Sequence, residues 1–92
     1  MKHFIIIKFK ENTDKDVLIE ETEKLFKETE TIEGIKKVEV FTNSIKKPNR
    51  FDMMIKITLN KGSLKELEQS RILKDWEDKY NKYIDKKTIF DC

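Results

Sequence analysis

The sequence predicts an α+β protein in which strands and helices follow one another in the order βαββαβ. Two kinds of apolar spacing lead to this prediction. Apolar residues alternate with a period of two in residues 2–9 and 51–59, which is typical of strands, and recur every three to four residues in the segment after each, which is typical of amphipathic helices. A chain of 92 residues has room for one hydrophobic core, so residues 1–92 are expected to form a single domain.

The first strand is expected at residues 2–9, KHFIIIKF, where both faces of the strand are apolar at its middle. A helix of about five turns follows, and Asn12 and Thr13 provide the residue types that cap a helix N-terminus. This helix is expected to end near Gly34, because glycine adopts the left-handed conformation that terminates helices.

The middle of the chain has the pattern of a hairpin with a long tip. Residues 38–41 alternate and predict the second strand, while Asn43 to Arg50 contain the only proline of the chain and predict the loop. Residues 51–59, FDMMIKITL, alternate more regularly than any other segment. They predict the third strand.

A second helical region is expected after the third strand. Ser63 and Glu66 have the spacing of a capping box at its start. Its apolar stripe is interrupted at Ser70 and Arg71, which predicts either two short helices or one kinked helix, and residues 88–92 predict the last strand. The resulting order is the ferredoxin-like split βαβ arrangement, a four-stranded antiparallel sheet with both helices on one face.

The sheet face turned away from the helices is expected to carry an apolar patch, because both faces of the strands contain apolar residues. Large patches of this kind usually mark an interface. We therefore predict a homodimer in which two sheets pack face to face; the alternative is a monomer with an apolar sheet surface. The expected interface residues are Phe4, Ile6, Phe41 and Met54, together with either Ile89 or Phe90.

Composition excludes several classes of function. His3 is the only histidine and Cys92 the only cysteine, too few ligands for an ordinary zinc site, and two glycines cannot build a glycine-rich phosphate loop. The 20 Lys and Arg residues nearly balance the 18 Asp and Glu residues, which argues against a nucleic-acid partner. The longest apolar run is too short for a signal peptide or a membrane span. We expect a cytoplasmic protein without metal, cofactor, nucleic acid or membrane partner.

Four segments resemble the Dabb family, the stress-responsive α/β-barrel domains. They are the opening KHFIIIKFK, then IEGIKKVEVF after the first helix, FDMMIKITL in the third strand, and the closing IFDC. The four occur in the family's order and cover nearly the whole chain. The resemblance implies a ferredoxin-like fold that dimerises by packing two sheets into a barrel. It implies no particular activity, since most members have none assigned and a fold does not determine a function.

A plant polyketide cyclase of this family has a histidine at the position that corresponds to His3. It also uses a second histidine and a tyrosine in its second helical region. In this chain Leu73 stands at the position of that histidine and Leu67 at that of the tyrosine. Removing a proton from carbon requires a group that titrates near neutral pH, which leucine cannot supply. We therefore expect a binding protein rather than an enzyme, with His3 as the single candidate acid or base.

A small apolar ligand is the expected partner besides a second copy of the chain. Apolar cavities with few polar groups are typical of small-molecule sites, and the space between sheet and helices has this composition. The alternative is that these side chains fill the space as ordinary core. The expected lining residues are His3, Ile5, Ile7, Thr22, Leu25, Ile55, Ile57, Leu67, Leu73 and Trp76.

Two other interpretations remain open. A small cyclase or monooxygenase-like enzyme of the dimeric α+β barrel type, with His3 as acid or base, is the alternative function. The basic residues at positions 46–50 either contact an acidic partner or form a solvated loop tip.

Overall fold

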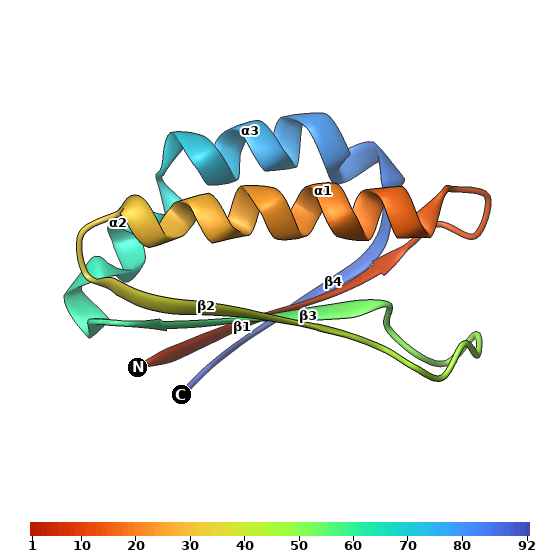
Figure 1. Ribbon diagram of the computed structural model, residues 1–92, viewed down its shortest axis with the longest axis horizontal. Helices are drawn as coiled ribbons and strands as arrows, with labels where there is room; N and C mark the ends of the chain where they lie inside the picture. The colour runs from red at the N-terminus through yellow and green to blue at the C-terminus, as the bar shows by residue number, and fades with distance from the viewer.

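The four strands form one antiparallel sheet in the order β2–β3–β1–β4 in the computed structural model, which describes residues 1–92 (Figure 1). The central strands are β1 (Lys2–Phe9) and β3 (Met53–Leu59), and the edge strands are β2 (Ile35–Thr42) and β4 (Ile84–Asp91). This topology confirms the predicted ferredoxin-like α+β fold.

All helices lie on one face of the sheet and leave the other face bare (Figure 1). They are α1 (Lys15–Glu28), α2 (Leu64–Glu68) and α3 (Arg71–Tyr80). Short 3-10 turns cover Thr29–Thr31, Lys61–Ser63 and Asn81–Tyr83. The second helical region is therefore two separate helices, one of the two forms that the interrupted apolar stripe allowed.

The hydrophobic core lies between the sheet and the helices. Every second residue of the central strands points into it, and Ile7, Ile55 and Ile57 are 0 % exposed. Two threonines of the first helical region are also fully buried, and each is hydrogen-bonded: Trp76 Nε1 donates to Thr22 Oγ1 at 3.1 Å, and Thr29 Oγ1 donates to the Phe26 carbonyl at 2.6 Å. Because their hydroxyls are satisfied, these polar residues are tolerated in the core.

Helix α1 begins later than predicted. Asp14, rather than Asn12 or Thr13, is the capping residue, and its carboxylate accepts a hydrogen bond from the Val17 amide at 3.3 Å. Thr13 is engaged elsewhere, because its hydroxyl donates to the Lys10 carbonyl in the preceding turn. The helix therefore gains its cap from the last of three adjacent residues of similar capping preference.

The predicted capping box at Ser63 is wrong. Ser63 lies in a 3-10 turn, and its side chain makes no capping hydrogen bond. Its hydroxyl instead packs against Gly34. A Cβ atom at position 34 would lie only 1.8 Å from Ser63 Oγ, and φ of Gly34 is +90°, so this position requires glycine. The cap that forms belongs to the next helix: the Leu73 amide donates to Ser70 Oγ at 3.2 Å.

Strands β2 and β4 begin earlier than predicted, and β3 begins two residues later than the alternating pattern indicated. Strand β4 pairs with β1 from Ile84 onward, although its first half contains the charged residues Asp85, Lys86 and Lys87. These side chains are exposed because β4 is an edge strand. Charges on an edge strand hide its alternation, which explains why the sequence pattern predicted a shorter element.

Candidate functional site

A cleft of about 200 Å³ lies between α3 and the β1–β4 edge of the sheet. Its inner wall is apolar, and its rim carries two carboxylates and one ammonium group. Nine residues line it: His3, Ile5, Phe26, Glu68, Leu73, Trp76, Glu77, Lys87 and Ile89. The cleft therefore suits a small molecule with an apolar body and a polar end.

His3 is the one histidine of the chain, and it is buried in this wall with 2 % of its surface exposed. The antiparallel register places it directly opposite Asp91 of β4, and its Nδ1–H donates to the Asp91 carboxylate. Every fully buried side-chain nitrogen or oxygen has a hydrogen-bond partner. Nε2 of His3 makes no hydrogen bond within the protein, so this atom is not fully buried. Nε2 is thus the ring nitrogen available to a molecule in the cleft.

The aromatic residues behind His3 are held by specific contacts. The rings of Phe26 and Trp76 meet edge to face with their centroids 5.0 Å apart. At the rim, Lys87 lies 3.8 Å from Glu77 and 5.6 Å from the centre of the Trp76 ring. Ile89 completes the rim and is 46 % exposed. The inner wall is therefore closely packed, whereas the rim consists of exposed side chains.

The predicted pocket residues divide into two groups. His3, Ile5, Leu73 and Trp76 line the cleft. Leu25 is half-buried against the core, and the remaining five are fully buried between sheet and helices: Ile7, Thr22, Ile55, Ile57 and Leu67. Leu73 thus faces the cleft, whereas Leu67 does not.

Sequence reasoning missed the contribution of β4 to the cleft. Ile89 and Lys87 line it and Asp91 holds His3, because Ile89 and Asp91 lie opposite Ile5 and His3 in the register. The signal in the sequence was the alternation of residues 87, 89 and 91, but the choice between Ile89 and Phe90 required the strand register.

The bare face of the sheet, called here the open sheet face, carries the predicted interface residues. Ile6 lies beside Met54, and Met54 beside Phe41, in the strand register. Phe90, rather than Ile89, belongs to this face: its ring lies 6.2 Å from that of Phe4, and 60 % of the residue is exposed. The open sheet face therefore presents a contiguous apolar surface to solvent.

Helices α1 and α3, which both contribute residues to the cleft, are joined outside it by a buried tyrosine. Tyr80 is 2 % exposed, and its hydroxyl donates to the Glu21 carboxylate across the two helices. Burial raises the pKa of Tyr80, and the hydrogen bond to Glu21 raises it further, while Lys79 acts in the opposite direction. Tyr80 therefore stays neutral at pH values at which an exposed tyrosine would already be ionised.

This environment predicts a loss of stability at alkaline pH. The pKa of Tyr80 is higher in the folded protein than in the unfolded chain. Its contribution to the free energy of unfolding is therefore fully present below the ordinary tyrosine pKa of about 10, and is lost as the pH rises through the folded pKa. We expect the melting temperature to fall as the pH rises above about 10, and to fall less steeply in Tyr80→Phe. Melting curves across this range test the prediction, and parallel profiles for the two proteins would contradict it.

Comparison with known proteins identifies the fold class. No protein-family model and no curated protein matches this chain in sequence. Among solved structures, a dimeric ferredoxin-like protein of unknown function from Bacteroides fragilis is similar over 97 % of this chain and 90 % of that one, with 14 % identity and a TM-score of 0.82. The chain thus belongs by structure to the ferredoxin-like α+β proteins.

Two enzymes share this architecture. The hydroxynitrile lyase from Passiflora edulis matches 97 % of this chain and 87 % of its own with 10 % identity and a TM-score of 0.77. An antibiotic biosynthesis monooxygenase is similar over 99 % of this chain and 96 % of its own, with 14 % identity and a TM-score of 0.76. Sequence identities this low support a shared fold but not a shared activity.

No helix of the chain is both long and apolar enough to cross a membrane.

Proposed function

We propose that this protein is a Dabb-like homodimer that binds a small, largely apolar molecule in the cleft between α3 and the β1–β4 edge. The observation that carries the proposal is the buried His3, which the Asp91 carboxylate orients within an otherwise apolar wall. A buried, fixed imidazole can offer one directed hydrogen bond, and the apolar wall supplies contact area. Both are characteristic of small-molecule sites.

The homodimer is supported by the open sheet face. Its apolar residues would cover one another if two sheets packed face to face about a two-fold axis, and Lys56 and Glu39, 3.7 Å apart, lie on the same face. Charged residues of both signs beside an apolar centre allow a self-complementary contact. The dimeric state of the Bacteroides fragilis protein with the same fold adds support.

The size of the cleft limits the ligand. Sites for drug-sized molecules usually measure about 300 to 1,000 Å³. A cleft of about 200 Å³ suits a smaller molecule, or one that extends over the rim at Ile89. Lys87 and Glu77 at this rim are the groups that would meet its polar end.

Native mass spectrometry of protein freshly purified from cells of its own source tests both parts of the proposal. We expect a mass of twice 11.1 kDa plus a discrete excess that corresponds to the ligand. Ile89→Trp places a larger side chain at the rim and should reduce the excess at least about tenfold. Val17→Trp is the matched control, because Val17 is also 46 % exposed but lies on α1 outside the cleft.

Two results would contradict this proposal. A dimer without any excess mass would show that the cleft does not retain a small molecule. An excess that persists in Ile89→Trp would place the ligand elsewhere in the protein.

The contact between His3 and Asp91 favours a second candidate function, an enzyme of the dimeric α+β barrel type with His3 as acid or base. Imidazole oriented by a carboxylate is a common arrangement for proton transfer. With Nδ1 directed to Asp91, Nε2 would exchange the proton with the bound molecule. In this case His3→Gln would retain the ligand but stop its chemical change, which the ligand's mass over time would reveal.

A further inference from the structure

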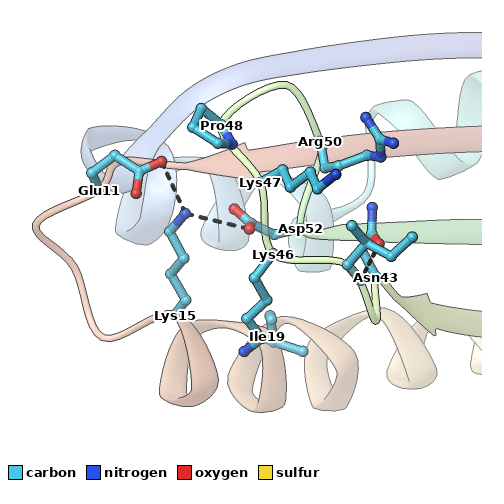
Figure 2. Close-up of a pocket in the computed structure, with 10 residues that line it drawn as sticks. Glu11, Lys15, Ile19, Asn43, Lys46, Lys47, Pro48, Arg50 and Asp52 are labelled. Carbon is cyan, nitrogen blue, oxygen red and sulfur yellow. Dashed lines mark hydrogen bonds and ion pairs between the residues drawn. The ribbon is translucent and has the colours of Figure 1, made fainter.

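A second and larger cleft lies at the opposite end of the sheet, between the start of α1 and the loop of residues 43–50. Its volume is about 420 Å³, twice that of the cleft at His3. Figure 2 shows Lys15 rising from α1 and Lys46 extending from the loop toward Ile19. Ten residues line this loop cleft: Glu11, Lys15, Ile19, Asn43, Ile45, Lys46, Lys47, Pro48, Arg50 and Asp52.

The two carboxylates of the loop cleft are already engaged within the protein. Asp52 Oδ2 accepts a hydrogen bond from the Phe9 amide at 2.7 Å, and Asp52 Oδ1 lies 3.4 Å from Lys15 Nζ. Glu11 approaches the same ammonium at 3.3 Å (Figure 2). Burial disfavours the charge on Lys15, but Asp52 and Glu11 outweigh it and raise the pKa of Lys15. Glu11 and Asp52 thus share one ammonium group, and Lys15 offsets one of their two negative charges.

The remaining cations of the loop cleft are not neutralised. Lys47 and Arg50 have no carboxylate within 4.0 Å. Lys46 has only Asp16, at 4.0 Å, and both side chains are more than 80 % exposed, so that pair contributes little. Lys47 and Arg50 therefore line the loop cleft without a carboxylate partner, and Lys46 has only a solvent-exposed one.

The loop that carries these charges is fixed in place. The Asn43 side chain accepts from the Ile45 amide at 2.8 Å and donates to the Phe51 carbonyl at 3.0 Å. Lys8, a buried residue, donates to the Pro48 carbonyl. A binding loop held in this way loses less conformational entropy when a ligand binds.

Apolar side chains lie beside the cations. Ile45 is 48 % exposed although it is large and apolar, and it shares the cleft with Ile19. An inorganic ion would leave this surface uncovered, whereas an organic anion would cover it. Guanidinium and ammonium groups favour phosphate, because a dianion attracts each of them more strongly than a monoanion does.

We propose that the loop cleft binds a small organic phosphate, with the phosphoryl group at Lys47 and Arg50 and the organic part against Ile45 and Ile19, beside Lys46. Phenyl phosphate is a suitable probe because it joins a dianion to one apolar ring. Benzoate keeps the ring with a single charge, and phenol keeps it without charge at neutral pH. The site is independent of the cleft at His3, so the proposal does not rest on the function proposed above.

The test is an NMR titration of the backbone amides with each probe, in wild type and two double variants. We expect saturable shifts with phenyl phosphate at residues 15–19 and 43–50, weaker binding of benzoate and none of phenol. Lys47→Ala/Arg50→Ala should weaken the binding of phenyl phosphate at least about tenfold. Lys65→Ala/Arg71→Ala, which removes the same two residue types from exposed positions outside this cleft, should not.

Three results would overturn the proposal. They are the absence of saturable shifts in these segments, equal affinity for phenyl phosphate and phenol, and an equal dissociation constant in wild type and Lys47→Ala/Arg50→Ala. Amide spectra of both double variants establish that each is folded before its affinity is compared.

Discussion

Replacing Ile6 by aspartate is expected to convert the proposed dimer to a monomer. Ile6 lies at the centre of the open sheet face, between Met54 of β3 and Thr88 of β4. Full burial of an exposed side chain of this size contributes about 1.5 to 3 kcal/mol. Ile6 is already partly buried within one chain, so each of the two copies in a two-fold interface contributes only part of this amount. The larger effect is the burial of two unpaired carboxylates, at several kcal/mol each, which weakens dimerisation at least about a hundredfold.

Light scattering during size-exclusion chromatography measures this change directly. Val17→Asp is the matched control, because it places the same charge at an exposed apolar position on the helical side of the molecule. Should Ile6→Asp fail to fold, Phe90→Asp tests the same face at a residue that is 60 % exposed in the single chain. An unchanged dimer mass for a folded variant of either residue would refute the sheet-to-sheet interface.

Replacing Trp76 by alanine is expected to cause the largest loss of stability. Trp76 is 1 % exposed, meets Phe26 edge to face and donates its indole N–H to Thr22. Truncating a buried tryptophan costs about 3 to 5 kcal/mol, partly because of the cavity that remains. A small domain is stable by about 5 to 15 kcal/mol in total, so the variant should be near the limit of folding.

Urea denaturation of a series of variants separates the contributions to this loss. Thr22→Val removes the acceptor of the indole N–H and keeps the volume, so it should cost about 1 to 3 kcal/mol. Val17→Ala removes exposed apolar surface and should stay within about 0.5 kcal/mol of wild type. A Trp76→Ala loss no larger than that of Thr22→Val would contradict the packing argument.

Part of the lining of the candidate cleft was predictable from the sequence, because the chain has one histidine and one tryptophan. Alternation places His3 and Ile5 on the helix-facing side of β1, and helical spacing places Leu73 and Trp76 on the inner side of α3. The same patterns also predicted Ile55 and Ile57 as pocket residues, but these are fully buried in the core. Periodicity identifies the face on which a side chain lies and does not reveal whether packing fills the space in front of it.

The sequence by itself determined the order of the elements, the ferredoxin-like arrangement and the apolar character of both faces of the sheet, because these follow from local periodicity and turn residues. Only the tertiary structure decided that Asp91 meets His3, that Ile89 rather than Phe90 reaches the cleft, and that Lys46, Lys47 and Arg50 face the start of α1. Each of these contacts joins residues that are distant in the chain. A strand register or a loop position depends on the packing of the whole domain, whereas a periodic pattern depends only on neighbouring residues.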